Sequence, residues 1–158
     1  MIYLSVGTYH EGFDRLVSLV DSLCSKKKIN CLAQIGNGKY LPSYIKYKRF
    51  ISLKKHLLNI KKSRFVIAHG GVGIISEIIN EKRPFLIFPR NRNEHSGHDQ
   101  KLSIKNLEKK IKLNVCYSEK KLKIEIIKFI NTKKFKTITL PKSNIPEIIK
   151  DFINKNYL

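Results

Sequence analysis

The sequence predicts an α/β fold, a Rossmann-like parallel sheet with helices on both faces. Apolar runs of strand length alternate with amphipathic stretches along the chain, and crossovers of this kind give a parallel sheet that is covered on both sides. The clearest unit is the apolar run Phe65–Ala68, the turn His69–Gly73, a helix-like stretch and a second apolar run at Pro84–Phe88. At 158 residues the chain has the length of one domain, and we expect a single domain over residues 1–158.

The first half of the chain alternates between strand and helix patterns. Ile2–Val6 is an apolar run, and Glu11–Lys26 carries apolar residues at helical spacing. Asn30–Ile35 predicts a second strand, which ends at the glycines that follow it. Tyr47–Ile51 predicts a short strand, and Ser52 can cap a helix through about Lys62. From that helix we expect the core to receive Leu53, Leu57, Leu58 and Ile60.

The second half continues the alternation. Phe65–Ala68 predicts a strand and Gly73–Glu81 a helix. In the strand Pro84–Phe88, proline stands at the first residue, where a missing N–H is tolerated. A polar loop, Pro89–Asp99, follows. The remaining expected elements are a helix at Gln100–Lys112, a short strand at Leu113–Cys116, a helix from Ser118 to Ile130, and a last helix at about Ile145–Lys155.

The chain is strongly basic. It has 32 Lys and Arg against 12 Asp and Glu, a net charge of +20. Three readings are open: codon usage in an AT-rich genome, attraction to an anionic membrane surface, and nucleic-acid binding. Nucleic acid is the least favoured partner, because aromatic residues are not interleaved with the basic ones as on a base-stacking platform.

Compartment signals favour the cytoplasm. No apolar run approaches the roughly 18 residues of a membrane span, and the start of the chain lacks the basic region of a signal peptide. The three cysteines, Cys24, Cys31 and Cys116, are scattered and odd in number. That usage is typical of a reducing compartment, where cysteine serves as a small buried residue.

In an open parallel sheet the ligand binds at the carboxyl ends of the strands. Three loops are expected there: Gly7–Gly12, His69–Gly73 and Pro89–Gln100. The sequence therefore predicts a site where these loops meet.

The glycine-rich loop offers a place for a phosphate. Gly70, Gly71 and Gly73 open a helix, and bare N–H groups at a helix N-terminus bind anions. The alternative is that the glycines only make a tight turn. The pattern is neither the dinucleotide fingerprint nor a P-loop. His69, at the strand end, can face the ligand or serve as a hydrogen-bonded structural residue.

Carboxylates and hydroxyls follow both strand ends. Glu77 lies about one turn into the helix, where it can accept both hydroxyls of a ribose or merely interact with the helix dipole. Ser76 is a weaker candidate on the same turn. In the first loop Gly7 and Thr8 can face the ligand, although Thr8 can also cap a helix, and His10 or Glu11 is a candidate base.

The third loop is rich in hydrogen-bonding groups. Its run from Arg90 to Gln100 suits a sugar, whose hydroxyls need many directional bonds, and it also fits a solvated loop. His95 and His98 with Asp99 or Glu94 could be read as metal ligands. The framework of a metal site is absent from the sequence, so we expect no metal.

These residues together resemble the nucleotide-sugar-binding C-terminal half of GT-B glycosyltransferases, the family 28 C-terminal type. The likeness covers about residues 1–130 and is nearest to the small donor-binding subunit of two-component bacterial exopolysaccharide or capsule glycosyltransferases. The chain is also similar to the catalytic subunit of the two-part N-acetylglucosaminyl transferase of asparagine-linked glycan assembly. The matching segments are Val6-Gly7-Thr8 with Phe13–Val17, His69–Gly73 with Glu77, and Pro84, Pro89-Arg90, Glu94-His95 and Gln100.

The chain departs from the family pattern at several positions. Ile74 stands where the family usually has threonine, and Lys82 where it usually has glycine. Tyr9-His10 replaces a more usual His-Glu, and His98-Asp99 a more usual Asp-His. These departures concern contacts to the sugar and the diphosphate.

The resemblance implies a UDP-sugar donor and an inverting, metal-independent transfer without a cofactor. Glu77 would hold the ribose, Glu94, His95 and Gln100 the sugar, and Gly71–Gly73 with Arg90 the leaving UDP. The acceptor would be a lipid-linked saccharide of surface-polysaccharide synthesis. A membrane-anchored partner would carry it at the inner face of the cytoplasmic membrane.

Alternatives remain at this point. The catalytic base is His10, Glu11 or a group of the partner. The chain could also be a non-catalytic enhancer subunit of such a transferase, or a basic nucleic-acid-binding domain. The donor sugar is glucose, galactose or N-acetylglucosamine.

Overall fold

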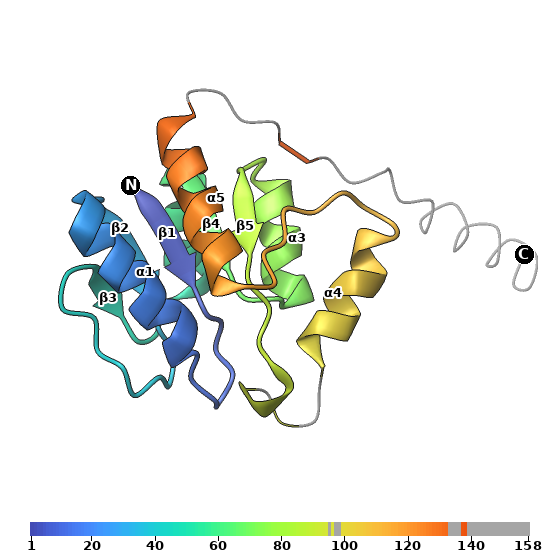
Figure 1. Ribbon diagram of the computed structural model, residues 1–158, viewed down its shortest axis with the longest axis horizontal. Helices are drawn as coiled ribbons and strands as arrows, with labels where there is room; N and C mark the ends of the chain where they lie inside the picture. The colour runs from blue at the N-terminus through green and yellow to red at the C-terminus, as the bar shows by residue number, and fades with distance from the viewer. Residues whose placement is uncertain (95, 97–98, 133–136, 139–158) are drawn as a thin grey trace, which may run out of the picture.

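A five-stranded parallel sheet forms the centre of the protein (Figure 1). The computed structural model describes residues 1–94, 96, 99–132 and 137–138. The sheet order is β3-β2-β1-β4-β5, and every neighbouring pair is parallel. The strands are β1 (Ile2–Ser5), β2 (Cys31–Gln34), β3 (Lys46–Lys48), β4 (Phe65–Ala68) and β5 (Phe85–Ile87). This sheet confirms the predicted α/β, Rossmann-like fold.

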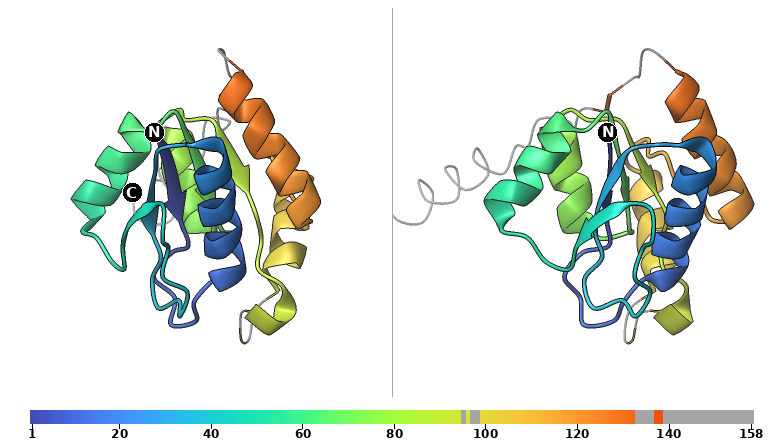
Figure 2. Two further views of the ribbon diagram at one scale, coloured as in Figure 1. Left: turned by 60° about the vertical axis from the view of Figure 1, so that its left-hand side comes forward. Right: turned by 90° about the vertical axis from the view of Figure 1, so that its left-hand side faces the viewer.

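Helices cover both faces of the sheet, as the two turned views show (Figure 2). α1 (Asp14–Lys27) and α5 (Glu119–Asn131) lie on one face. α2 (Leu53–Lys62), α3 (Val72–Asn80) and α4 (Gln100–Glu108) contribute to the core on the other. A 3₁₀ turn, η1 (Arg92–Glu94), lies in the loop between β5 and α4.

The alternation of side chains along β1 divides the core into two. Ile2 and Leu4 join the cluster under α1 and α5, whereas Tyr3 joins the cluster under α2 and α3. All four residues of β1 and of β4 are buried. Such continuous burial is typical of central parallel strands, and it explains why these segments have no polar alternation.

Several local predictions are confirmed. The strand Phe65–Ala68 has the predicted bounds. The Ser52 and Ser118 side chains cap α2 and α5, accepting hydrogen bonds from the N–H groups of Lys55 at 3.5 Å and Lys121 at 3.3 Å. Each cap satisfies one of the free N–H groups of a helix start.

The predicted core face of α2 is confirmed at Ile60 and wrong at Leu53 and Leu58. Leu53 and Leu58 are 63% and 44% exposed, and the buried residues of this helix are His56 and Ile60. His56 and Ile60 are four residues apart and therefore lie on one helical face. The His56 imidazole can be buried there because both of its nitrogens have hydrogen-bond partners, described below.

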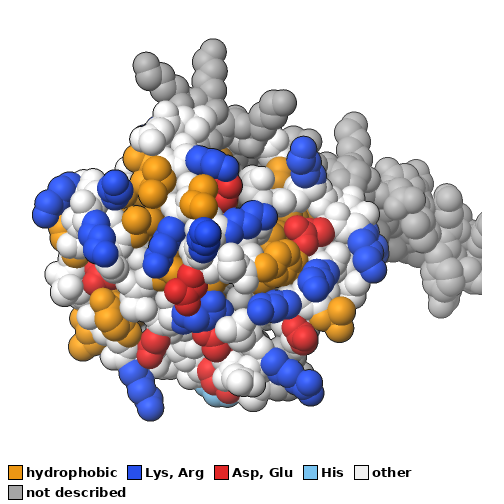
Figure 3. All heavy atoms as spheres, in the orientation of Figure 1, with side chains coloured by type: hydrophobic (Ala, Val, Ile, Leu, Met, Phe, Trp, Pro, Cys, Tyr) orange, Lys and Arg blue, Asp and Glu red, His pale blue; other side chains and the backbone are white. Residues whose placement is uncertain are grey.

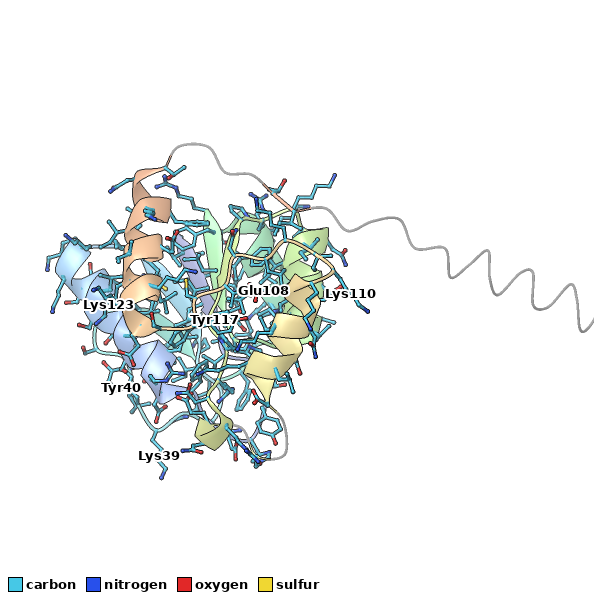
Figure 4. All side chains as sticks on the ribbon, turned by 45° about the vertical axis from the view of Figure 1, so that its right-hand side comes forward. Lys39, Tyr40, Glu108, Lys110, Tyr117 and Lys123 are labelled. Atoms are coloured by element: carbon cyan, nitrogen blue, oxygen red, sulfur yellow. The ribbon has the colours of Figure 1, made fainter. Side chains whose placement is uncertain are left out.

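Other boundaries shift. β3 begins at Lys46, one residue before the prediction, and ends at Lys48, three before it. α4 ends at Glu108 instead of Lys112, and residues 113–116 form only an isolated bridge, Ile87 with Val115. The Tyr117 hydroxyl donates to Glu108 and ties the end of α4 to the segment before α5 (Figure 4).

The expected last helix at about residues 145–155 lies outside the described residues. Among the residues that are described, no helix is long and apolar enough to cross a membrane. Cys24, Cys31 and Cys116 are buried free thiols. Lys82, which follows α3, has a φ of 50°, in the left-handed region where glycine costs least.

Candidate functional site

A cavity of about 720 Å³ opens at the carboxyl ends of the strands. The first loop contributes Gly7, Thr8 and His10 to its wall, and the third contributes Gln100. The second loop and the helix after it contribute His69, Gly70, Gly71, Gly73 and Glu77. The three loops expected to converge therefore do so around one cavity.

The His69 ring fills the space between the first two loops. A Cβ on Gly7 would lie 2.6 Å from the His69 Cε1 atom, and a Cβ on Gly71 would also collide with the ring. Gly7 has a φ of 80°, which alone favours glycine. With His69 in this position, a side chain at Gly7 or Gly71 would collide with its ring, and Gly7 also has a backbone conformation that favours glycine. At these two positions the glycines are explained by close packing of the turn, without a phosphate ligand.

Gly73 differs from the other glycines. A Cβ at this position would meet nothing within 4 Å, although Gly73 lies inside the helix α3 and on the cavity wall. The N-cap of α3 is Gly71, which has no side chain to cap the helix. The open space over Gly73 and the N–H groups of the helix start together make a surface suited to an anion.

Gln100 joins the second loop to the third. Its Oε1 atom accepts hydrogen bonds from the N–H of Gly70 at 3.2 Å and the N–H of Arg90 at 3.1 Å. The side chain is buried. A Cβ on Gly70 would lie 3.0 Å from Ile104 and 3.2 Å from Pro89, so the loops are closely packed there. Pro89 itself is buried behind the wall.

Arg90 lies outside the cavity wall, fully buried, and its guanidinium bonds to the backbone. It donates to the carbonyl of Val6 at 3.2 Å, to that of Glu94 at 3.2 Å and to that of Gly12. It also stacks over the Phe13 ring at 4.6 Å. Desolvation lowers the pKa of Arg90 below its usual value. In this position the guanidinium connects the first and third loops through their backbone carbonyls, and it does not line the cavity.

Glu94 and Glu11 belong to a neighbouring cavity of about 440 Å³. Glu94 accepts two hydrogen bonds from Arg15, at 2.8 and 2.6 Å, and one from the Asn91 N–H at 2.7 Å. Burial opposes ionisation of Glu94, but these hydrogen bonds outweigh it and lower its pKa. Glu11 accepts from the Ser96 N–H at 2.8 Å. His10 lines both cavities and so stands between them.

Glu77 receives a partner that the sequence did not reveal. The Nε2 atom of His56 lies 3.1 Å from Glu77 Oε2, and the Nδ1 atom lies 2.7 Å from the Tyr3 hydroxyl. Gln34 also lines the cavity, with its Oε1 atom 3.4 Å from the same hydroxyl. The available signal for His56 was its place four residues before Ile60 on one helix face.

The remaining predicted residues lie elsewhere. Ser76, on α3, is not part of the cavity wall. His95 and His98 fall outside the described residues. Over the part of the chain that is described, no group of three or more His, Cys, Asp or Glu side chains could hold a metal ion.

Comparison with known sequences gives one family. The model of the Glycosyltransferase family 28 C-terminal domain matches residues 1–154. No curated protein matches the chain at a significant level.

Three solved structures are similar to the chain at low identity, and those with TM-scores above 0.5 share its fold. A glycotransferase of kitacinnamycin is similar over 84% of this chain, with 14% identity and a TM-score of 0.57. The molybdenum cofactor binding protein of Rippkaea orientalis is similar over 83% of this chain and 96% of its own, with 14% identity and a TM-score of 0.52. A glycosyltransferase of Streptomyces nogalater matches 66% at 16% identity, with a TM-score of 0.46. The chain spans only about a third of the two glycosyltransferases, 35% and 29% of their lengths.

Proposed function

Since the chain belongs to the family of glycosyltransferase family 28 C-terminal domains, we propose that it is the donor-binding subunit of a UDP-sugar-dependent glycosyltransferase. It would transfer a hexose (glucose, galactose or N-acetylglucosamine) to a lipid-linked saccharide in surface-polysaccharide synthesis. One observation carries the donor site: the uncapped start of α3, with open space over Gly73, lies on the same cavity wall as the Glu77 carboxylate.

The parts of a nucleotide sugar fit this wall in order. The diphosphate would bind the N–H groups at Gly71–Gly73, where the helix dipole favours negative charge. The ribose hydroxyls would donate to Glu77, whose side chain is 33% exposed. Ile51 and Leu53 are apolar residues of the same wall and would pack against the base. The sugar would extend toward Gln100 and His10.

The proposed reaction is a direct displacement at the anomeric carbon. The acceptor hydroxyl attacks as the bond to UDP breaks, a base takes the hydroxyl proton, and UDP leaves with its charge stabilised by the start of α3. Because the helix performs this stabilisation, the proposal needs no divalent metal. His10 is the better-placed base of this chain, since Glu11 accepts the Ser96 N–H and lines only the neighbouring cavity. A base from the partner is the alternative.

We propose further that a membrane-anchored partner binds the acceptor. The support is the resemblance of the motifs to small donor-binding subunits. The net charge of +20 would hold the subunit at the anionic inner face of the cytoplasmic membrane. Figure 3 shows Lys and Arg side chains spread over the face that carries α1 and α5.

The experiment is calorimetric titration with UDP and then with UDP-glucose, UDP-galactose and UDP-N-acetylglucosamine, with and without EDTA. We expect UDP binding that EDTA does not change and that Glu77→Ala weakens about tenfold or more, the worth of hydrogen bonds to a charged group. Glu81→Ala, near the end of the same helix, removes the same charge and should bind as the unchanged protein does. UDP binding that survives Glu77→Ala would contradict the proposal.

A second candidate is a non-catalytic enhancer subunit. Ile74 favours it, because this apolar side chain lines the cavity where the family resemblance expects a threonine. This candidate predicts a stable chain that forms the complex with its partner but has no measurable affinity for UDP.

A further inference from the structure

We propose that His56 is a positioning residue that orients the Glu77 carboxylate toward the two hydroxyls of a ribose, with Tyr3 fixing the tautomer of His56. The inference rests on the proposed donor site and adds to it a residue of the same cavity wall that acts through Glu77. The three side chains come from three elements, β1, α2 and α3, and form one hydrogen-bonded chain.

The geometry of this chain is close. The Tyr3 hydroxyl lies 2.7 Å from His56 Nδ1, and His56 Nε2 lies 3.1 Å from Glu77 Oε2. The Tyr3 ring meets the imidazole edge-on, with ring centroids 5.5 Å apart. The side chains become more exposed along the chain, from Tyr3 at 0% through His56 at 11% to Glu77 at 33%. The chain therefore leads from the core to the cavity wall.

The direction of each hydrogen bond follows from the groups involved. A carboxylate only accepts, so His56 Nε2 carries the hydrogen that points to Glu77. In a neutral imidazole the other nitrogen then accepts, and it accepts from the Tyr3 hydroxyl. Burial raises the pKa of Tyr3, which keeps its proton on the oxygen. The Tyr3 hydroxyl also lies 3.4 Å from Gln34 Oε1, but its contact with His56 Nδ1, at 2.7 Å, is the shorter of the two.

His56 occupies one of the roughly four acceptor sites of the Glu77 carboxylate, which leaves sites for both hydroxyls of a ribose. His56 binds Glu77 Oε2, and Oε1 has no hydrogen-bond partner within the part of the chain that the structure describes. A glutamate side chain has several rotamers, and ordering it only when the ligand binds costs affinity. Because His56 already orders the Glu77 side chain in the free protein, less affinity is lost when the ligand binds. The effect should be largest for a ligand with a ribose, because its two adjacent hydroxyls bind a carboxylate of fixed orientation.

A simpler role is possible for the same contacts, namely a link between α2 and α3 that only stabilises the fold. The two roles differ in what they do to nucleotides. A link that only supports the wall would, when removed, weaken every nucleotide to a similar extent. A positioning residue affects only ligands that carry the ribose hydroxyls.

The experiment compares UDP with 2′,3′-dideoxy-UDP by calorimetry. In the unchanged protein UDP should bind more tightly. His56→Phe should reduce that preference about tenfold while the dissociation constant of the dideoxy compound changes less than about twofold. His56→Gln, whose amide can still donate to Glu77, should keep most of the preference. Leu58→Phe, an exposed position on the same helix, is the control and should change neither constant.

Non-additivity completes the test. His56→Phe combined with Glu77→Gln should be no worse than Glu77→Gln alone, because both act through one contact. The preference is a ratio measured within each variant, so a partly unfolded sample does not distort it. Equal loss for both nucleotides, or additive losses, would overturn the inference. A folded, unchanged protein that binds neither nucleotide overturns the proposed function and this inference with it, whereas UDP binding that depends on Glu77 and not on His56 overturns the inference alone.

Discussion

At the scale of single residues, Gly73 distinguishes the two interpretations of the glycine-rich loop, a tight turn and a phosphate site. Gly7 and Gly71 are accounted for by the His69 ring, whereas nothing in the fold requires a glycine at Gly73. Inside a helix, alanine is favoured over glycine. A glycine that stands on a cavity wall without a packing reason fits close approach of a ligand to the backbone.

The change Gly73→Ala should therefore act in opposite directions on stability and binding. We expect the free energy of unfolding to rise by about 0.5–1 kcal/mol, the usual gain of alanine in a helix. We expect UDP affinity to fall about tenfold or more, because the methyl group would stand over the helix N–H groups. Urea unfolding and calorimetry measure the two effects.

Gly70→Ala is the matched comparison. Its Cβ would press on Ile104 and Pro89, so this change should destabilise the protein. If Gly73→Ala binds UDP as tightly as the unchanged chain, the start of α3 is not the diphosphate site.

The residues of the site were predictable to different degrees. The wall residues Gly73 and Glu77 follow from a loop between a strand and a helix, which local sequence reveals. His56 was missed because its role comes from Tyr3 and Glu77, residues that the fold brings to it from 53 and 21 positions away. Arg90 was expected at the diphosphate, but the carbonyls that hold its guanidinium lie on two loops, and no sequence pattern records them.

At the scale of elements, Asp21 of α1 anchors the segment between β2 and β3. Its carboxylate accepts from the N–H groups of Ser43, Tyr44 and Ile45 at 2.9–3.0 Å, and also from the Ser43 and Tyr40 hydroxyls. Burial opposes ionisation of Asp21, but these hydrogen bonds together outweigh it and lower its pKa.

Because the pKa of Asp21 is lowered in the folded state, its stabilisation is present above its unfolded value of about 4 and is lost as the pH falls below it. Asp21→Asn should lower the free energy of unfolding at neutral pH by about 2 kcal/mol, since hydrogen bonds to a charged group are replaced or broken. The variant should also lose less stability than the unchanged chain between about pH 5 and pH 2.

Urea unfolding across this pH range measures both effects. Glu94, whose pKa is also lowered, acts in the same window, so part of the acid sensitivity should remain in Asp21→Asn. Glu81→Gln is the control for removing one acid. Equal acid sensitivity of Asp21→Asn and the unchanged chain would show that this carboxylate does not stabilise the fold in its charged form.

Elements with one dominant signal were predicted well. β4 is a continuous apolar run between turn residues, and the caps at Ser52 and Ser118 depend on local chemistry alone. The buried face of α2 was predicted only in part. Leu53 and Leu58 were expected in the core because they are leucines, but both are exposed, and His56 is buried instead. β3 is short and partly exposed, and its pairing with β2 has no strong sequence signal.

At the scale of the whole molecule, the charge of +20 predicts binding to anionic membranes. Basic residues near an anionic surface each contribute favourably, and salt screens the attraction. We expect the chain to sediment with vesicles containing about 30% anionic lipid at low salt and to be released at about 0.5 M salt. Vesicles of neutral lipid are the control. Equal binding to neutral vesicles would contradict an electrostatic mechanism.

The fold class was predictable at this scale because strand-like and helix-like segments alternate along the chain, and this order is compatible with few topologies. The order of the strands and the cavity needed the structure, since they depend on how crossovers bring distant loops together.

The three backbone carbonyls that bind the Arg90 guanidinium bear on attempts to redesign the loops around the cavity. The Arg90 guanidinium joins Val6 and Gly12 at the first loop to Glu94 at the third, so a change of shape in one loop would disturb hydrogen bonds that also hold the other. Libraries that vary the two loops separately and then recombine the best clones should meet strong epistasis. Substitutions in them are better selected jointly, with Arg90 kept constant.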